Sequence, residues 1–376
     1  MKNVSLLIKP ASSLCNLCCR YCFYDDVSGN RSVKSMGLMS KETAERLIQS
    51  AFEAVEPGGA ISFAFQGGEP TLAGLNFFQK FVAAEKKYAR PGVRVSHAIQ
   101  TNGMAFDEEW AAFLREHQFL VGLSVDGIKE IHDLYRKDRE SEGTWNRVTK
   151  ILHLLQKNQV EVNLLCVVTG QCARSPQKVY HTLKKLGVNY LQFIPCLDPL
   201  KEERGKAPYS LLPEAYGKFL CGLFDAWYLD WKNGQYVSIR LFDDYVHLMM
   251  GQPSGSCATS GSCGSYFVVE SDGSLYPCDF YVLDEWRLGK LADISLADAG
   301  QCALAERFQS DGRKKPDACA ECKWYPICFG GCKRDWQTVD GHLENYYCEA
   351  FRRFFEYAAP RLSEIAHTEA SYHGGI

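Results

Sequence analysis

Three cysteines near the N-terminus have the spacing of a metal-binding loop. Three residues separate Cys15 from Cys19, and two separate Cys19 from Cys22. Three thiolates on one tight loop can ligate three irons of a [4Fe–4S] cube. A complete ligand set for such a cube is four cysteines. The missing ligand leaves one iron open, and catalytic metal sites keep such an open position. Tyr21 and Phe23 flank the last cysteine and would shield the cube from water.

A zinc site is the alternative for this loop. Structural zinc takes four Cys or His ligands at similar spacing, but no fourth ligand stands close by and the histidines lie further along the chain. Cys18 interrupts the pattern. Its position directly beside Cys19 is sterically unfavourable for a ligand, and we expect that Cys18 does not bind the cluster.

A glycine-rich segment follows the second predicted strand. It runs Gln66–Gly67–Gly68–Glu69–Pro70. The two glycines allow the backbone to approach a ligand closely, and Glu69 can accept a hydrogen bond from a ligand ammonium. By itself such a segment is an ordinary turn at a strand end. Its place after the three-cysteine loop indicates a ligand site instead.

Eight cysteines in the C-terminal part suffice for two fully ligated cubes. They are Cys257, Cys263, Cys278, Cys319, Cys322, Cys328, Cys332 and Cys348. Two zinc ribbons are the alternative, and spacing alone does not exclude them. The wide, irregular intervals and the interleaved aromatic residues Trp324, Tyr325 and Phe329 favour clusters.

The composition of the chain restricts its class. Seventeen cysteines in 376 residues indicate metal binding or catalysis, because cytosolic thiols are kept reduced. The formal net charge of −3, without a basic stripe, disfavours nucleic-acid binding. No apolar run reaches the roughly 18 residues of a transmembrane helix, and Met1–Pro10 lacks the features of a signal peptide. These observations predict a cytoplasmic protein that does not enter a membrane.

Six strand–helix units must position these residues. The predicted strands are Val4–Lys9, Ile61–Phe65, Val93–Gln100, Leu120–Val125, Glu161–Thr169 and Tyr190–Ile194. The predicted helices are Lys41–Val55 with Ser40 as its N-cap, Asn76–Tyr88, Glu108–Glu116 capped by Asp107, Thr144–Asn158, Pro176–Leu186 and the long Pro213–Asn233. This alternation predicts a parallel sheet, either doubly wound or curled into a partial barrel. In such barrels the chemistry lies at the C-terminal ends of the strands, where residues 11–24, 66–70, 101–103 and 126–127 fall.

The amino-acid composition of the sequence changes from Gly251 onward. Gly, Ser and Cys become more frequent and the predicted strands shorten. A small domain with little regular core usually needs bound metal or disulfide bonds to be stable. We therefore place a domain boundary near residues 235–255, with a first domain over 1–235 and a cysteine-rich second domain with a C-terminal helix over 236–376.

These segments together resemble the radical S-adenosylmethionine (SAM) superfamily. The first cysteine loop and the Gly67–Pro70 turn match its specific motifs, and the region 257–348 resembles the SPASM auxiliary-cluster domain. Within the superfamily the chain is similar to the anaerobic sulfatase-maturating enzymes over residues 6–13, 63–74, 100–103, 121–127, 192–200 and 271–289. The resemblance implies an α/β fold, a partial (β/α)6 TIM-like barrel followed by a SPASM domain. It also implies oxidation of a Cys or Ser in a sulfatase precursor to Cα-formylglycine.

The resemblance also implies roles for individual residues. Cys15, Cys19 and Cys22 would hold the SAM cluster; Cys257, Cys263, Cys278 and Cys332 a first auxiliary [4Fe–4S] cluster; and Cys319, Cys322, Cys328 and Cys348 a second. The catalytic base of the family corresponds to Asp279, for which a solvated turn carboxylate is the alternative. The expected cofactor-binding residues are Tyr21, Tyr24, Gln66, Gly67, Gly68, Glu69, Ser124, Arg136 and Leu197.

Some of these cofactor contacts can be specified further. Ser124 and Arg136 would bind the SAM carboxylate, although Arg136 could instead form a surface ion pair with Asp133 or Asp138. Tyr24 and Gln66 would line the pocket shared by SAM and the peptide, and Leu197 would pack on the adenine.

The implied partners are an unfolded sulfatase peptide with the target residue and an electron donor such as flavodoxin or ferredoxin. Two rival functions remain. Another SPASM enzyme, which crosslinks or decarboxylates a small peptide, would keep all three clusters. A non-catalytic zinc-binding protein would be colourless and would not bind SAM. The chain departs from the family pattern at Cys18, and its tail from about residue 367 matches nothing in the family.

Overall fold

The computed structural model describes residues 1–373, which form two compact units. The first unit comprises residues 1–124, 132–163 and 264–310, and the second comprises residues 125–131, 164–263 and 311–373. Within the described part of the chain, no helix is long and apolar enough to span a membrane.

Seven strands of the first unit form one sheet in the order β10-β9-β8-β1-β2-β3-β4. Their bounds are β1 (Asn3–Lys9), β2 (Ala60–Phe65), β3 (Arg94–Thr101), β4 (Leu120–Ser124), β8 (Phe267–Glu270), β9 (Ser274–Tyr276) and β10 (Gly289–Lys290). β1 to β4 are parallel, and β8 pairs with β1 in parallel, with Lys9 beside Glu270. The cysteine-rich part of the chain thus adds strands directly to the edge of β1.

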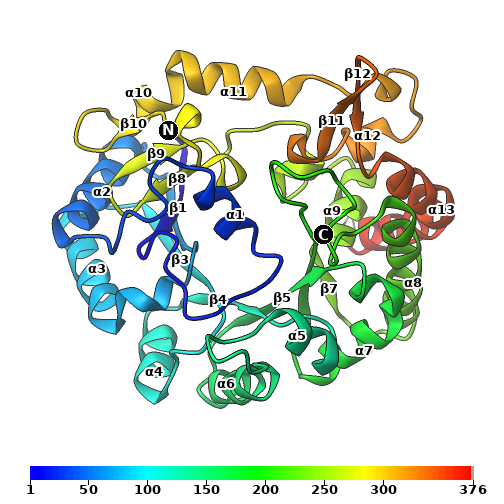
Figure 1. Ribbon diagram of the computed structural model, residues 1–376, viewed down its shortest axis with the longest axis horizontal. Coiled ribbons are helices and arrows are strands. Elements are labelled where there is room, and N and C mark those ends of the chain that lie inside the picture. Colours follow the sequence, from blue (N-terminus) through cyan, green and yellow to red (C-terminus); the bar gives the residue numbers. More distant parts are fainter. Residues whose placement is uncertain (374–376) are drawn as a thin grey trace. The chain divides into compact units, whose positions relative to one another are not determined.

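Helices cover the outer face of this sheet. They are α2 (Lys41–Ala54), α3 (Leu75–Tyr88), α4 (Glu108–Glu116) and α6 (Trp145–Lys157). α2, α3 and α4 lie outside the strands, whereas α1 (Phe23–Gly29) lies on the inner side (Figure 1). Phe65 on β2 packs edge-to-face against Phe78 and Phe81 of α3, with ring centroids 4.9 and 5.0 Å apart. These aromatic contacts hold α3 to the sheet and leave the inner face for other residues.

The second unit contains most of β5 (Val162–Val168) together with β6 (Tyr190–Pro195) and β7 (Ser238–Ile239), which pair in parallel. Its helices include α7 (Pro176–Lys185), α8 (Pro213–Lys232), α9 (Arg240–Met249), α12 (Tyr325–Cys328) and α13 (Cys348–His373). α13 packs against α8 and α9, where Phe354 stacks on Phe242 at 5.5 Å. A hairpin of β11 (Trp336–Val339) and β12 (His342–Asn345) precedes α13. The helices α10 (Leu296–Gln301) and α11 (Ala303–Arg313) complete the part of the chain that follows β10.

The predicted alternation of strands and helices is confirmed, with each predicted element found within one residue of its expected ends. Both predicted caps are present. Ser40 accepts a hydrogen bond from the N–H of Thr43 at 3.1 Å, and Asp107 accepts one from the N–H of Trp110 at 2.9 Å, each satisfying a free donor of the first turn. The helices α1, α5 (Lys129–Tyr135), α9 and α11 were not predicted. Of these, α1 and α5 have seven residues each and are too short to show a helical period in the sequence.

Candidate functional site

The three-cysteine loop leaves the C-terminal end of β1 and is held by the segment that follows α5. The N–H of Cys18 donates to the carbonyl of Lys137 at 2.7 Å, and the N–H of Arg20 donates to that of Tyr135 at 3.1 Å. The guanidinium of Arg139 donates to the carbonyl of Cys15 at 2.9 Å. The loop therefore has a fixed backbone from which its cysteines project.

The chemistry of this loop fits an iron–sulfur cluster. Burial raises the pKa of the Cys15 thiol to about 11, and the nearby Glu69 and Cys22 act in the same direction. Burial also raises the pKa of Cys22. Such thiols become thiolates when a metal centre supplies the opposing positive charge. Three soft thiolate donors on a fixed loop match the ligand preference of a [4Fe–4S] cluster.

A single zinc ion and a cluster differ in the spacing that they require of their cysteine ligands. Sulfurs around one zinc lie about 4 Å apart, because each is about 2.3 Å from the metal. Within residues 1–373, no three His, Cys, Asp or Glu side chains converge closely enough to hold one ion. A cube bears one thiolate on each iron, so its sulfur ligands stand further apart than those around a single ion.

Arg136 lies against the cysteine loop. Its guanidinium is 4.0 Å from the Sγ of Cys19 and 5.5 Å from the ring centre of Tyr21. The residue is 9% exposed, so its guanidinium is buried rather than on the surface. Asp138, one of the two partners considered for it, pairs with Arg147 at 3.0 Å. A buried guanidinium at this place suits a ligand carboxylate, and that contact stays a prediction.

The two glycines after β2 are required by the protein itself. Gly67 has φ +93° and Gly68 has φ +32°. A Cβ on Gly67 would lie 2.6 Å from the side chain of Lys9, and one on Gly68 would lie 2.2 Å from the carbonyl oxygen of Leu14. The sequence predicted that the backbone of these glycines approaches a ligand. In the structure it approaches β1 and the start of the cysteine loop instead. Contact of either glycine with a cofactor stays a prediction.

Glu69 is a buried carboxylate with a full set of donors. It is 1% exposed and accepts from the N–H and hydroxyl of Thr71 at 3.1 and 2.6 Å, from the hydroxyl of Thr101 at 2.7 Å and from the N–H of Asn102 at 2.8 Å. Burial raises its pKa, although these hydrogen bonds oppose the shift. Glu69 thus ties the end of β2 to the end of β3.

Asn102 joins this tie to the cysteine loop. Its amide donates to Asn16 at 2.8 Å and lies 3.8 Å from the Sγ of Cys15. Sequence reasoning placed residues 101–103 at a strand end but assigned Asn102 no role. Its position beside Cys15 was not visible in the sequence, because it depends on how β1 and β3 lie across β2.

Asp279 also lies on the inner face of the sheet, and its own carboxylate is buried. It is 5% exposed, which excludes the solvated turn residue of the alternative interpretation. Its Oδ1 forms an ion pair with Nζ of Lys9 at 2.5 Å, and its Oδ2 accepts from the amide of Gln66 at 2.8 Å. The hydroxyl of Tyr266 accepts from the N–H of Asp279 at 3.2 Å and donates to the Sγ of Cys278 at 3.6 Å.

Tyr24 connects this carboxylate to a second buried ion pair. The Nζ of Lys9 lies 3.6 Å from the centre of the Tyr24 ring, and the Tyr24 hydroxyl donates to Glu270. Arg31 pairs with Glu270 at 2.5 Å, with both side chains fully buried. Sequence reasoning missed Lys9, Arg31 and Glu270. The available signal was a charged residue at the end of two apolar strands, LLIK and FVVE.

Two further residues, Ser124 and Leu197, were predicted to contact SAM. Ser124 is the last residue of β4 and is 8% exposed. Leu197 follows β6 in the second unit and is half-buried. Their contacts with SAM stay predictions.

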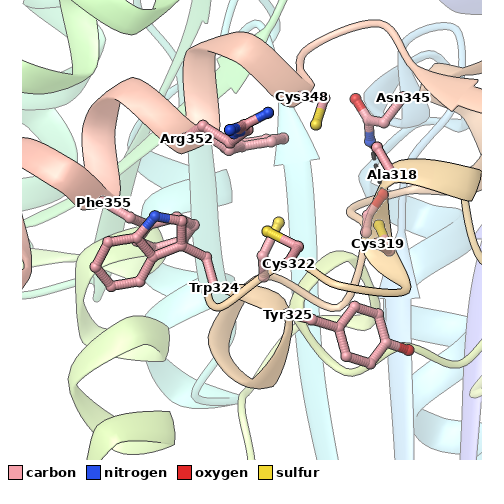
Figure 2. A pocket seen from close by; sticks show the side chains of 12 residues that line it. Ala318, Cys319, Cys322, Trp324, Tyr325, Asn345, Cys348, Arg352 and Phe355 are labelled. Carbon is pink, nitrogen blue, oxygen red and sulfur yellow. Dashed lines mark hydrogen bonds between the residues drawn. The ribbon is translucent and has the colours of Figure 1, made fainter.

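Four C-terminal cysteines line one pocket of the second unit. Cys319, Cys322, Cys328 and Cys348 share it with the aromatic side chains Trp324, Tyr325, Phe351 and Phe355. Figure 2 shows Cys319, Cys322 and Cys348 around a common space, with Trp324 and Phe355 to one side. Burial raises the pKa of Cys319 to about 11 and that of Cys328 to about 12. The donor set and its apolar surroundings fit a fully ligated cluster.

The other predicted auxiliary ligands are divided between the units. Cys257, Cys263 and Cys332 belong to the second unit and Cys278 to the first. Burial raises the pKa of both Cys257 and Cys263. The assignment of these four cysteines to one cluster stays a prediction, as does the domain division at residue 235.

Comparison with known proteins finds matches over nearly the whole chain. Residues 10–186 match the radical SAM superfamily, and residues 261–323 match the SPASM iron–sulfur cluster-binding domain. A cysteine-type anaerobic sulfatase-maturating enzyme of Clostridium perfringens is 50% identical over 97% of this chain and 99% of its own. A serine-type enzyme of Klebsiella pneumoniae is 34% identical over 93% of this chain and 86% of its own.

Solved structures agree with the sequence matches. The structure described as native anSMEcpe with bound AdoMet and Kp18Cys peptide has a TM-score of 0.92 and 48% identity, covering 97% of this chain and 99% of that one. The expected α/β fold with a partial barrel and a SPASM domain is thereby confirmed. Streptococcus suis SuiB bound to S-adenosylmethionine, at 16% identity and a TM-score of 0.59 over 88% of this chain and 73% of its own, shares the fold alone.

Proposed function

The chain belongs to the radical SAM superfamily and, within it, to the anaerobic sulfatase-maturating enzymes, and from this premise we propose that it oxidises a cysteine of a sulfatase precursor to Cα-formylglycine. The 50% identity to a cysteine-type enzyme, against 34% to a serine-type one, favours cysteine as the target. The substrate is an unfolded peptide segment of the sulfatase. The electron donor is a small redox protein such as flavodoxin or ferredoxin, and the reaction takes place in the cytoplasm.

Three residues would hold the SAM cluster, namely Cys15, Cys19 and Cys22. When bound, the cofactors supply a 5′-deoxyadenosyl radical that removes one hydrogen atom from the target Cβ, and an auxiliary acceptor for one electron. Arg136 and Ser124 would orient the SAM carboxylate. Tyr21 would shield the cluster from water, and Tyr24 would line the pocket shared by SAM and the peptide.

Asp279 is the residue to which we assign the proton transfer. A general base has to lie within hydrogen-bond reach of the proton that it removes, and its buried carboxylate is held on the inner face of the sheet. It takes the thiol proton of the substrate. Loss of a hydrogen atom from Cβ, a proton from sulfur and one electron converts the C–SH group into C=S, and water then releases sulfide and leaves the aldehyde. This held, buried carboxylate beside Cys278 is the observation that carries the proposal.

The decisive experiment replaces the base in anaerobically reconstituted, dithionite-reduced enzyme. We expect Asp279→Asn to lower formylglycine formation by at least about 100-fold, the usual contribution of a general base, while 5′-deoxyadenosine still forms. Asp272→Asn is the control, because Asp272 pairs with Lys290 at 2.9 Å in the same unit. Full product formation by Asp279→Asn would remove this residue from the mechanism.

Mass spectrometry of the peptide product separates this function from its rival. A cysteine peptide should lose sulfur and gain an aldehyde, and the matched serine peptide should react more slowly. A crosslinked or decarboxylated product would identify another type of SPASM enzyme.

A further inference from the structure

Lys9 is a charged residue at a place where the sequence pattern calls for an apolar one. It ends β1, and its side chain is fully buried. Removing an ammonium from water is costly unless it is paired with an opposite charge. Its ion-pair partner is Asp279, whose Oδ1 lies 2.5 Å from Nζ. The ammonium therefore cannot leave this carboxylate without becoming an uncompensated buried charge.

The Asp279 carboxylate is fixed through both oxygens and through the backbone. Lys9 holds Oδ1, and the Gln66 amide donates to Oδ2 at 2.8 Å. The Tyr266 hydroxyl accepts from the N–H of Asp279 at 3.2 Å. Of these contacts only Lys9 brings a full opposite charge. It is thus the charged contact of the carboxylate, whereas Gln66 gives Oδ2 a neutral hydrogen bond and Tyr266 binds only the backbone of Asp279.

Lys9 reaches Asp279 along a path that exists only because residue 67 is glycine. A Cβ at Gly67 would lie 2.6 Å from Cγ, 2.8 Å from Cδ and 2.8 Å from Nζ of Lys9. Side chains do not tolerate such contacts, so any other residue would displace the lysine. The second glycine of the pair, Gly68, has a different neighbour, the backbone of residues 12–14.

A second ion pair keeps Lys9 from turning away. The Tyr24 ring covers the ammonium at 3.6 Å, and the Tyr24 hydroxyl is bound to Glu270, which pairs with Arg31. Glu270 therefore has its own cation and its own donor. The four buried charges thus pair as Lys9 with Asp279 and Arg31 with Glu270, and Tyr24 contacts both pairs.

We propose that Lys9 is the positioning residue of the proposed base: its ammonium holds the Asp279 carboxylate where the substrate proton is released, and Gly67 is glycine so that Lys9 can reach it. This inference rests on the proposed function of Asp279. A displacement of about 1 Å at a reacting group can cost roughly 100-fold in rate. The loss should therefore fall on turnover with bound peptide rather than on peptide binding.

The test measures formylglycine formed per 5′-deoxyadenosine in reconstituted enzyme at saturating peptide. We expect Lys9→Met to lower this ratio at least about tenfold with little change in the KM for peptide. Lys9→Arg keeps the charge and should recover part of the loss. Gly67→Ala keeps the lysine but blocks its path, and should lower the ratio as well. In an Asp279→Asn background, Lys9→Met should lower the ratio no further.

The matched control lies in the second unit. Lys184 pairs with Asp230 at 2.6 Å, and the hydroxyl of Tyr180 donates to the same carboxylate at 2.6 Å. Lys184→Met thus breaks another Lys–Asp–Tyr group, one whose lysine is 28% exposed, and should lower the melting temperature without changing the product ratio. Iron content of every variant is measured to establish that the clusters are loaded.

The outcomes separate this inference from the proposed function. If Asp279→Asn abolishes the product while Lys9→Met and Gly67→Ala keep the normal ratio, Lys9 has no positioning role and the proposed function stands. If Asp279→Asn keeps the normal ratio, the proposed base is wrong. Should Lys9→Met fail to fold, Gly67→Ala decides, because a normal ratio in that variant overturns the inference.

Discussion

The Glu69 carboxylate accepts a hydrogen bond from the backbone N–H of Asn102, with 2.8 Å between oxygen and nitrogen. This contact joins the end of β2 to the end of β3 between two buried residues. Two threonine hydroxyls donate to the same carboxylate. The strand ends that carry the glycine-rich turn and Asn102 are thus held by one charge, independently of any ligand.

Glu69→Gln should destabilise the first unit before any cofactor is added. The amide replaces one acceptor oxygen by an NH2 group that faces donors, and hydrogen bonds to a charged group contribute about 1.5–3 kcal/mol each. We expect the free energy of unfolding to fall by about 2 kcal/mol or more, measured by denaturant unfolding without SAM. The control is Glu53→Gln, which alters an exposed hydrogen bond to Gln49 and should have a much smaller effect. If Glu69→Gln and the unchanged protein have equal free energies of unfolding, the hydrogen bonds of Glu69 contribute little to stability.

Gly68→Ala should impair the cysteine loop. The new Cβ would lie 2.2 Å from the carbonyl oxygen of Leu14 and would push the start of the loop away from β2. We expect lower iron content and slower SAM cleavage. Gly74→Ala is the control, since Gly74 also has a positive φ of +80° but nothing within 4 Å of the added Cβ. If both variants lose iron equally, backbone strain rather than the clash is responsible.

Iron content should fall in steps of one cluster. Cys15→Ala should lower iron from about twelve to about eight atoms per chain and abolish SAM cleavage. Cys319→Ala should remove a similar amount of iron but leave the cleavage of SAM measurable. Cys302→Ala, which changes a thiol with no predicted metal role, should keep the full content. Zinc in place of iron in the anaerobically purified protein would contradict all three expectations.

Asp243 should make the protein less stable as the pH rises from about 4 to about 6. Burial raises its pKa to about 6 from an ordinary value of 3.8, although Ser238 donates to it at 2.5 Å. The folded protein then binds more protons than the unfolded chain in this window, so its stability falls with rising pH. Asp243→Asn should flatten this slope and raise the melting temperature at pH 7.

The control for this pH dependence has the opposite sign. Asp272 has a lowered pKa despite burial, because Lys290 and Ser274 donate to its carboxylate. Asp272→Asn should therefore lower the melting temperature at pH 7. The same response from both variants would mean that loss of a carboxylate, rather than its pKa, sets the effect.

Local features of the sequence determined the elements of this fold. The apolar periods of strands and helices, and caps such as Ser40 and Asp107, depend on neighbouring residues, which is why each predicted element begins and ends within one residue of its expected position. The cysteine spacings are local as well. They indicated loops that can hold clusters, and the pocket around Cys319 and Cys348 fits that interpretation.

Tertiary structure alone decided which charged groups meet on the inner face of the sheet. Gln66 and Asp279 are 213 positions apart in the chain, and the parallel pairing of β8 with β1 places Lys9 beside Glu270. In the sequence, a lysine at a strand end suggests an exposed residue, and Gly67 suggests a ligand turn. A charge is stable when buried only if a partner lies within a few ångströms, and that partner comes from a distant segment. No local pattern can therefore reveal it.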